Sequence, residues 1–222
     1  MSSIEENITH LRKDIPPTVT LVAVSKTKPV IAIQEAYDGG QRIFGENKIQ
    51  EMSEKWEQLP KDIQWHMIGH VQTNKVKQMI SYVNLIHSAD RLKLFKEINK
   101  QAILTNRIVD VLLQVKIARE DTKYGMPLLD AKTLLEGDQL LEFPNVNVVG
   151  LMGMASFTND LTQIEAEFKL LEGLFIRFRE SKNLSILSMG MSGDYKLAIE
   201  NGSTMIRVGS AIFGARNYNQ TP

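Results

Sequence analysis

The sequence predicts an α/β protein: a single (β/α)8 barrel of the TIM type, with one extra helix at its N-terminus. Two observations support this prediction. Short apolar runs rich in β-branched residues alternate with segments of helical periodicity, and eight such runs occur in 222 residues, a length that suits a compact barrel. An open, doubly wound parallel sheet is the alternative, because it shows the same alternation. No linker, low-complexity tract or internal repeat is present, so we expect residues 1–222 to form one domain.

Each predicted strand is a short apolar run bounded by polar or turn residues. The clearest run, residues 108–117, is interrupted only by Asp110, Gln114 and Lys116. The first run ends at a loop that contains Pro29. The eight runs are 20–25, 42–45, 65–69, 84–87, 108–117, 146–151, 184–187 and 204–208.

The segments between these runs carry helix start and stop signals. Pro29 suits the first turn of a helix, and Gly39 with Gly40 suits its end. Asp90 and Asp160 can each cap a following helix, the second with Gln163 at the reciprocal position. The predicted helices are 4–13, 29–38, 47–58, 73–80, 90–102, 128–141, 161–178 and 193–201.

The helix predicted at 161–178 has the most regular pattern in the chain. Its apolar side chains recur at steps of three and four and form one stripe, which favours a helix that packs on a sheet over a partner surface. The stripe consists of Leu161, Ile164, Phe168, Leu171, Phe175 and Phe178.

Composition narrows the classes of function. Lys plus Arg equals Asp plus Glu at 26 each, so no net charge attracts the protein to nucleic acid or to an acidic membrane. The absence of cysteine excludes disulfides, thiolate metal sites and a cysteine nucleophile. His66 and His70 lie four apart, but no third ligand has a suitable spacing, so no metal site is predicted. Without a secretory signal or a bilayer-spanning apolar run, we expect a cytoplasmic protein.

The residues that carry chemistry stand where predicted strands end. Lys26 follows the first apolar run, where partial burial would lower its pKa and make its amine a nucleophile. The loop 189–193 combines glycines with the hydroxyl of Ser192, which can also cap the next helix, and Gly209 with Ser210 follows the eighth strand. Loops seven and eight hold phosphate in many such barrels. A lysine beside a phosphate cradle indicates pyridoxal 5'-phosphate (PLP), although a Schiff-base aldolase acting on a sugar phosphate fits the same chemistry.

Seven blocks of the sequence carry a further resemblance. They are VAVSKTK at 22–28, FGENKIQE at 44–51, WHMIGHVQTNK at 65–75, SMGMS at 188–192, GST at 202–204, RVGS at 207–210 and IFG at 212–214. In this order, across nearly the whole chain, they resemble the pyridoxal phosphate homeostasis protein family, formerly called proline synthetase co-transcribed proteins. The barrel of that family is similar to the N-terminal domain of alanine racemase.

This resemblance implies roles for individual residues. Lys26 matches the lysine that forms the internal aldimine with PLP. Arg207 matches the arginine that faces the pyridine nitrogen, and Asn47 matches an asparagine close to the cofactor. The phosphate-binding positions are matched by Ser192, Gly209 and Ser210.

Three residues near the expected site have more than one interpretation, and a fourth is left unassigned. Lys28 and Lys123 could also reach PLP, but a solvated surface position is the preferred interpretation for each. Glu46 could act as an acid or base near the ring, or it could pair with a nearby lysine. Tyr124 is assigned no role in cofactor binding.

Arg207 bears on the expected activity. PLP stabilises a carbanion through a protonated pyridine nitrogen, which an always cationic arginine disfavours. Alanine racemase tolerates this arrangement with a tyrosine from a second domain, and no such domain is expected after the eighth strand of this chain. We therefore expect a protein that holds PLP as a Schiff base and delivers it to apo-enzymes without robust catalysis, and the resemblance favours a monomer. The alternatives are a PLP-dependent amino-acid racemase and, with less support, the aldolase.

Overall fold

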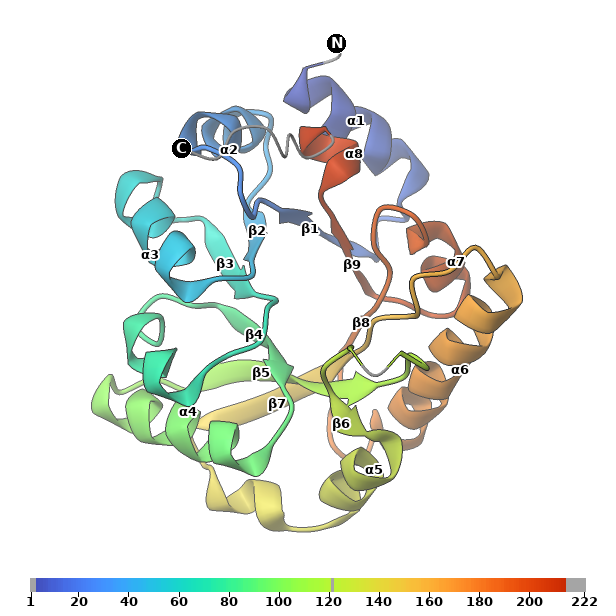
Figure 1. The fold of residues 1–222 in the computed structure, drawn as a ribbon. Helices are drawn as coiled ribbons and strands as arrows, with labels where there is room; N and C mark the ends of the chain where they lie inside the picture. The colour runs from blue at the N-terminus through green and yellow to red at the C-terminus, as the bar shows by residue number, and fades with distance from the viewer. Residues whose placement is uncertain (1–2, 121, 215–222) are drawn as a thin grey trace.

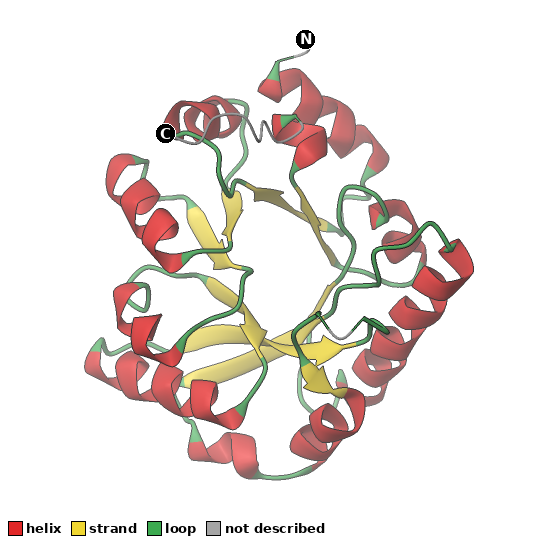
Figure 2. Ribbon diagram, in the orientation of Figure 1, coloured by secondary structure: helices red, strands yellow, loops and turns green. Residues whose placement is uncertain are grey.

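Eight parallel strands close into a barrel that is surrounded by helices (Figures 1 and 2). The computed structural model describes residues 3–120 and 122–214, so the predicted domain 1–222 includes a few residues outside the described part. The two ends of the strand order also pair with each other, residues 85–89 with residues 110–113, which confirms the closed barrel and excludes the open sheet. The barrel strands are β1 (Thr20–Val24), β2 (Ile43–Glu46), β3 (Gln64–Met67), β4 (Leu85–Ala89), β5 (Val109–Lys116), β7 (Val146–Met152), β8 (Ile186–Ser188) and β9 (Met205–Val208).

Helices cover the outside of the barrel, and the extra N-terminal helix is present. It starts with a capping box, in which Ser3 Oγ accepts from the Glu6 N–H and the Glu6 carboxylate accepts from the Ser3 N–H. The α-helices are α1 (Ile4–Asp14), α2 (Val30–Asp38), α3 (Ile49–Gln58), α4 (Leu92–Leu104), α5 (Leu128–Glu136), α6 (Leu161–Phe178), α7 (Tyr195–Glu200) and α8 (Ser210–Phe213).

Several local predictions were wrong. The helix predicted at 73–80 is a 3-10 helix, η1 (Thr73–Gln78), because apolar spacing does not distinguish the two kinds of turn. The helix predicted at 128–141 ends at Gly137, and a second 3-10 helix, η2 (Gln139–Glu142), follows. Helix α8 and the short β6 (Met126–Pro127), which pairs only with β5, had no sequence signal.

Of the two predicted aspartate caps, one is confirmed. Asp160 Oδ1 accepts from the Gln163 N–H at 3.1 Å, although the Gln163 side chain donates to Glu167 instead of returning to the cap. Asp90 does not cap α4, which begins one residue later, after Arg91. Its carboxylate instead contacts the Arg91 guanidinium and lies 3.5 Å from His70 Nδ1.

Apolar side chains form two layers, one on each side of the barrel wall. The outer layer lies between strands and helices and contains Trp65, Phe95 and the buried stripe of α6 from Ile164 to Phe178; only the first residue of that stripe, Leu161, is exposed. The inner layer takes one buried apolar residue from each of five strands. It consists of Val22, Leu85, Leu112, Met152 and Met205.

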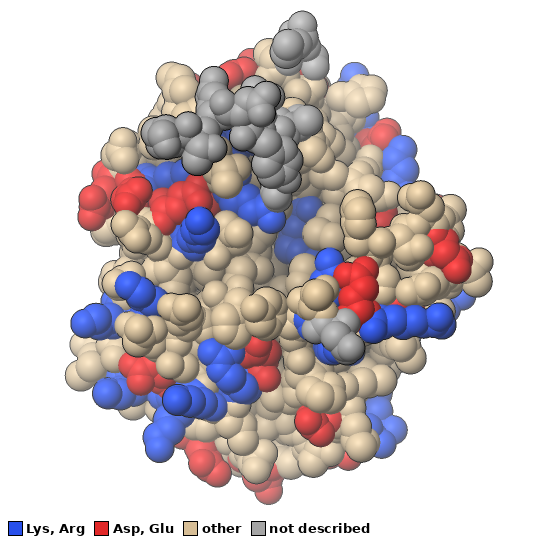
Figure 3. Space-filling model, viewed as in Figure 1, with Lys and Arg blue, Asp and Glu red and all other residues tan. Residues whose placement is uncertain are grey.

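Two residues further along these strands, the barrel interior becomes polar. The inward positions there are buried and are occupied by His66, His87, Gln114, Ser188 and Arg207. In parallel barrels the carboxyl ends of the strands lie at one face, so this polar layer lies directly beneath that face. Figure 3 shows the face hollowed at its centre, with Lys and Arg side chains inside the hollow.

Candidate functional site

Lys26 lies at the mouth of the barrel, immediately after β1, as predicted. Val22 belongs to the inner layer, and β1 ends at Val24, two residues before Lys26. The lysine is partly buried. It lies in a turn that is closed by the Lys28 N–H donating to the Ser25 carbonyl at 3.0 Å. The chain therefore places Lys26 at the carboxyl end of β1, at the face above the polar layer.

The strand register brings the ends of β2 and β9 beside Lys26. Val24 pairs with Gly45 of β2, so Asn47 stands two residues past its pair just as Lys26 does. Ala23 pairs with Val208 of β9, so Gly209 follows at the next level. A Cβ on Gly209 would lie 3.2 Å from the Val24 carbonyl oxygen, which shows how closely the β9 end approaches β1.

The loops after β8 and β9 are joined at the same mouth. Ser192 Oγ accepts a hydrogen bond from the Gly209 N–H at 3.3 Å, and Ser210 is exposed beside it. The prediction that Ser192 caps a helix was wrong, because α7 begins only after Asp194, whose Oδ1 accepts from the Met191 N–H at 2.6 Å. The two loops still supply hydroxyl and backbone N–H donors of the kind that bind phosphate.

Asn47 contributes an unsatisfied acceptor to the mouth. Its Oδ1 is buried and has no hydrogen-bond partner among residues 3–120 and 122–214. The Asn47 backbone is fixed by Gly69, where a Cβ would lie 2.3 Å from the Asn47 carbonyl oxygen. A buried acceptor without a partner is unfavourable, so this oxygen fits the hydroxyl donor of a bound ligand. Together with an amine and a cluster of donors for phosphate, it fits PLP.

Arg207 is buried in the polar interior below these loops. Its Nη1 donates to Ser188 Oγ at 2.6 Å, and its Nη2 donates to the Gly153 carbonyl at 3.0 Å. Burial lowers the pKa of Arg207 to about 10, so the guanidinium stays charged at neutral pH. The structure therefore holds a fixed cation under the mouth.

Two histidines continue from Arg207 across the barrel. Ser188 Oγ lies 3.2 Å from His87 Nδ1, and His87 Nε2 lies 3.0 Å from His66 Nδ1. Burial lowers the pKa of His66 to about 3 and that of His87 well below its usual value, so both rings are neutral. Sequence analysis assigned no role to His87. The inward alternation of the strands was the only available signal, because the hydrogen bonds themselves join residues far apart in the chain.

His66 and His70, four residues apart in the sequence, contact different partners. His66 faces His87, whereas His70 stacks on the Tyr124 ring at a centroid distance of 4.5 Å. Within residues 3–120 and 122–214, no group of three or more histidine and acidic side chains is placed to bind a metal ion. In the same part of the chain, no helix is long and apolar enough to cross a membrane.

Lys28 and Lys123, the other two lysines that could reach PLP, have partners elsewhere. Lys28 Nζ donates to the carbonyls of Phe213 and Gly214 at 3.0 and 3.3 Å, which ties β1 to the end of α8. Lys123 Nζ lies 3.6 Å from the Glu120 carboxylate.

Glu46 pairs with a lysine, which was one of its two interpretations. Ile43 and Gly45 face the interior of the barrel, so Glu46 faces outward, toward α3. There its Oε1 lies 2.7 Å from Lys55 Nζ, and both side chains are buried. Sequence analysis did not single out Lys55.

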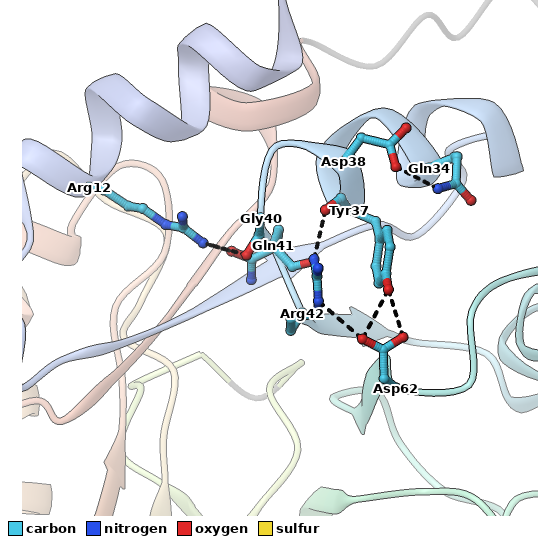
Figure 4. Close-up of polar contacts among 8 residues, drawn as sticks. All are labelled: Arg12, Gln34, Tyr37, Asp38, Gly40, Gln41, Arg42 and Asp62. Carbon is cyan, nitrogen blue, oxygen red and sulfur yellow. Dashed lines mark hydrogen bonds and ion pairs between the residues drawn. The ribbon is translucent and has the colours of Figure 1, made fainter.

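A separate cavity of about 370 Å³ lies at the opposite end of the barrel, where the strands begin. Its two arginines are already engaged (Figure 4). Arg12 donates to the Gln41 side chain, and Arg42 donates to the Tyr37 carbonyl and pairs with Asp62 at 3.2 Å. These contacts connect α1 and α2 to the beginnings of the strands, so we assign the two arginines a structural role.

The comparisons with known proteins agree with this geometry. The family described as alanine racemase, N-terminal domain, matches residues 1–217. The pyridoxal phosphate homeostasis protein of Aquifex aeolicus is 41% identical over 89% of this chain and 87% of its own length, and that of Vibrio alginolyticus is 38% identical over 99% and 100%. PipY of Synechococcus elongatus PCC7942, solved without PLP, matches at a TM-score of 0.89 and 36% identity, over 95% of this chain and 100% of that one. A second PipY structure, with PLP bound, matches at a TM-score of 0.86 and 35% identity, over 95% of this chain and 100% of that one.

Proposed function

This chain belongs to the alanine racemase N-terminal domain family and, within it, to the pyridoxal phosphate homeostasis proteins, and from this we propose that it binds PLP at the mouth of its barrel and serves PLP homeostasis. It holds the cofactor and delivers it to apo-enzymes. One observation carries the proposal: the strand register brings Lys26, Asn47 and the loops after β8 and β9 to one mouth.

Each residue of the proposed site has a definite task. When bound, PLP supplies a reactive aldehyde and an electron-withdrawing ring. Lys26 Nζ condenses with the aldehyde carbon, which forms a carbon–nitrogen double bond and releases water. Asn47 Oδ1 accepts from the ligand hydroxyl and Arg207 faces the ring nitrogen. The phosphate is bound by Ser192, Gly209 and Ser210.

The same residues argue against robust catalysis. Arg207 is a cation that only donates hydrogen bonds, so it disfavours protonation of a facing ring nitrogen and weakens any carbanion stabilisation. His66 and His87 are neutral, buried and hydrogen-bonded to each other, so neither is an available acid at neutral pH. We expect purified protein loaded with PLP to show no robust racemisation of alanine or of other amino acids.

The first test is the absorption spectrum of the purified protein with PLP, before and after borohydride, followed by peptide mapping. We expect a visible band that disappears on reduction and a pyridoxyl mass on the Lys26 peptide. Lys26→Ala should lose both, whereas Lys123→Ala should keep both. A protein that stays colourless and unlabelled with PLP, or that borohydride traps only with a sugar phosphate, would overturn the proposal in favour of an aldolase.

The proposal also includes cellular properties that go beyond the binding site. A monomeric state, a cytoplasmic location and transfer to apo-enzymes stay predictions. Transfer is measured by mixing PLP-loaded protein with an apo PLP-dependent enzyme and following the gain of enzyme activity. Recovery faster than with the same amount of free PLP would support direct delivery, and recovery at the rate of PLP release into solution would contradict it.

A further inference from the structure

We propose that Lys55 is a positioning residue for Lys26: a buried ion cluster around Lys55 holds the strained turn from which Lys26 enters the mouth of the barrel. This inference rests on the proposed function, because Lys26 is there the anchor of PLP. Lys55 lies on α3, outside the barrel wall, and acts only through the turn.

The turn that carries Lys26 has an unfavourable backbone. It runs from Ser25 to Lys28 and is closed by the Lys28 N–H donating to the Ser25 carbonyl at 3.0 Å. The residue after Lys26, Thr27, has a φ of 63°. A β-branched residue rarely adopts this left-handed conformation, which persists only where surrounding contacts hold it.

Lys55 and Glu51 supply those contacts on both sides of Lys26. On the side before it, Lys55 Nζ donates to the Ser25 carbonyl at 2.8 Å. On the side after it, the Thr27 N–H donates to Glu51 Oε1 at 2.6 Å, and the same oxygen accepts from Lys55 Nζ at 2.7 Å. The Lys55 ammonium group therefore connects the two peptide groups that flank Lys26, one directly and the other through Glu51.

Glu46 completes the cluster from β2. Its Oε1 accepts from Lys55 Nζ at 2.7 Å and from Ser25 Oγ at 2.6 Å, and the side chain is fully buried. Burial raises the pKa of Glu46, and the Lys55 charge opposes that effect. Without the Lys55 charge, two carboxylates would lie close together beside the turn with no counter-ion inside the cluster.

Lys55 cannot take the place of Lys26 as the anchor. An ammonium group has three N–H donors, and those of Lys55 have three acceptors: the Ser25 carbonyl, Glu46 and Glu51. The Lys55 side chain is buried on the outer side of the wall, whereas Lys26 follows the carboxyl end of β1 at the mouth. The function of Lys55 toward PLP is therefore to orient the turn.

The test compares PLP with pyridoxine 5'-phosphate, which has the same ring and phosphate but an alcohol where PLP has the aldehyde, so it cannot bond to Lys26. Lys55→Met removes the ammonium group and its charge and leaves an unbranched side chain that is one atom shorter. We expect this variant to bind PLP roughly tenfold or more weakly and to form the borohydride-trapped Lys26 adduct more slowly, as a displaced nucleophile would. Its affinity for pyridoxine 5'-phosphate should stay within about threefold of the wild type. Lys55→Arg should recover part of the PLP affinity.

Two further variants separate positioning from stability. Lys132→Met is the control: it removes an exposed ion pair on α5, in which Lys132 Nζ lies 3.9 Å from Glu136 Oε1. It should change neither the affinity for PLP nor that for pyridoxine 5'-phosphate. Thr27→Gly relieves the backbone strain, so it should fold at least as well as wild type and still slow adduct formation, because the turn becomes mobile. This variant keeps the inference testable where Lys55→Met does not fold.

The outcomes distinguish the two claims. Equal losses for PLP and pyridoxine 5'-phosphate in Lys55→Met would make Lys55 a general structural residue, and no loss for either would leave it without a role; both overturn the inference. Adduct formation at wild-type rate in Thr27→Gly also counts against it. A wild-type protein that binds neither compound, or forms no adduct at Lys26, would refute the proposed function itself.

Discussion

Acid should destabilise this protein through its two buried histidines. Burial lowers the pKa of His66 to about 3, whereas a histidine in the unfolded chain titrates near 6.5. Below that unfolded value the unfolded state takes up a proton that the folded state does not, so the stability present at pH 7 is lost as the pH falls. From pH 6.5 to pH 5, a difference of about 1.5 units at 1.36 kcal/mol per unit gives a loss of about 2 kcal/mol from His66 alone. His87, whose pKa is also lowered by burial, adds a loss of the same sign.

The assay is urea unfolding at pH 7, 6 and 5, followed by tryptophan fluorescence, for the wild type and His66→Gln. Carboxylates titrate in both proteins, so the difference between their unfolding free energies isolates the histidine. We expect wild type to be the more stable at pH 7 and its advantage to shrink by about 2 kcal/mol at pH 5. An advantage that is constant over this pH range would refute the reasoning.

The hydrogen-bond chain gives an independent check by NMR. Arg207 can only donate, so the Ser188 hydroxyl proton is left for its other partner, His87 Nδ1. His87 Nε2–H then donates to His66 Nδ1. Nitrogen shifts should therefore show both rings as the neutral Nε2–H form at pH 6, and an imidazolium signal from either ring would contradict the assignment.

Two other substitutions test the packing of the mouth. Gly69→Ala would place a Cβ 2.3 Å from the Asn47 carbonyl oxygen, so we expect a loss of about 2 kcal/mol or more in urea unfolding, together with weaker PLP binding; Gly173→Ala, with open space around its Cβ, is the control and should not destabilise. Glu167→Ala removes a buried carboxylate that accepts from the Ser156 N–H and hydroxyl at 2.6 and 2.7 Å. We expect the free energy of unfolding in urea to fall by about 3 kcal/mol. An unchanged unfolding midpoint would show that the loops after β5 and β7 do not depend on this carboxylate.

Much of the architecture could be predicted from local pattern. All eight barrel strands occur where short apolar runs predicted them, and α6 follows its apolar stripe. The kind of helix at η1 and the cap of α4 could not be predicted, because each depends on hydrogen bonds that the apolar spacing does not show. The end of α5 at Gly137 did have a signal, the glycine itself. The position of Lys26 at a strand end was predicted and is confirmed, because β1 ends at Val24.

The sequence by itself determined the alternation of strands and helices, the strand ends that carry Lys26, Asn47 and Arg207, and the family. These are properties of neighbouring residues, since apolar periodicity and short motifs are read over a few positions. Only the tertiary structure decided that the sheet closes and that Ser188 connects Arg207 to His87. It also decided that Lys55, on a helix outside the wall, holds the turn of Lys26. Such contacts join residues far apart in the chain, and they exist only after apolar burial has closed the barrel and left its buried polar groups to pair with one another.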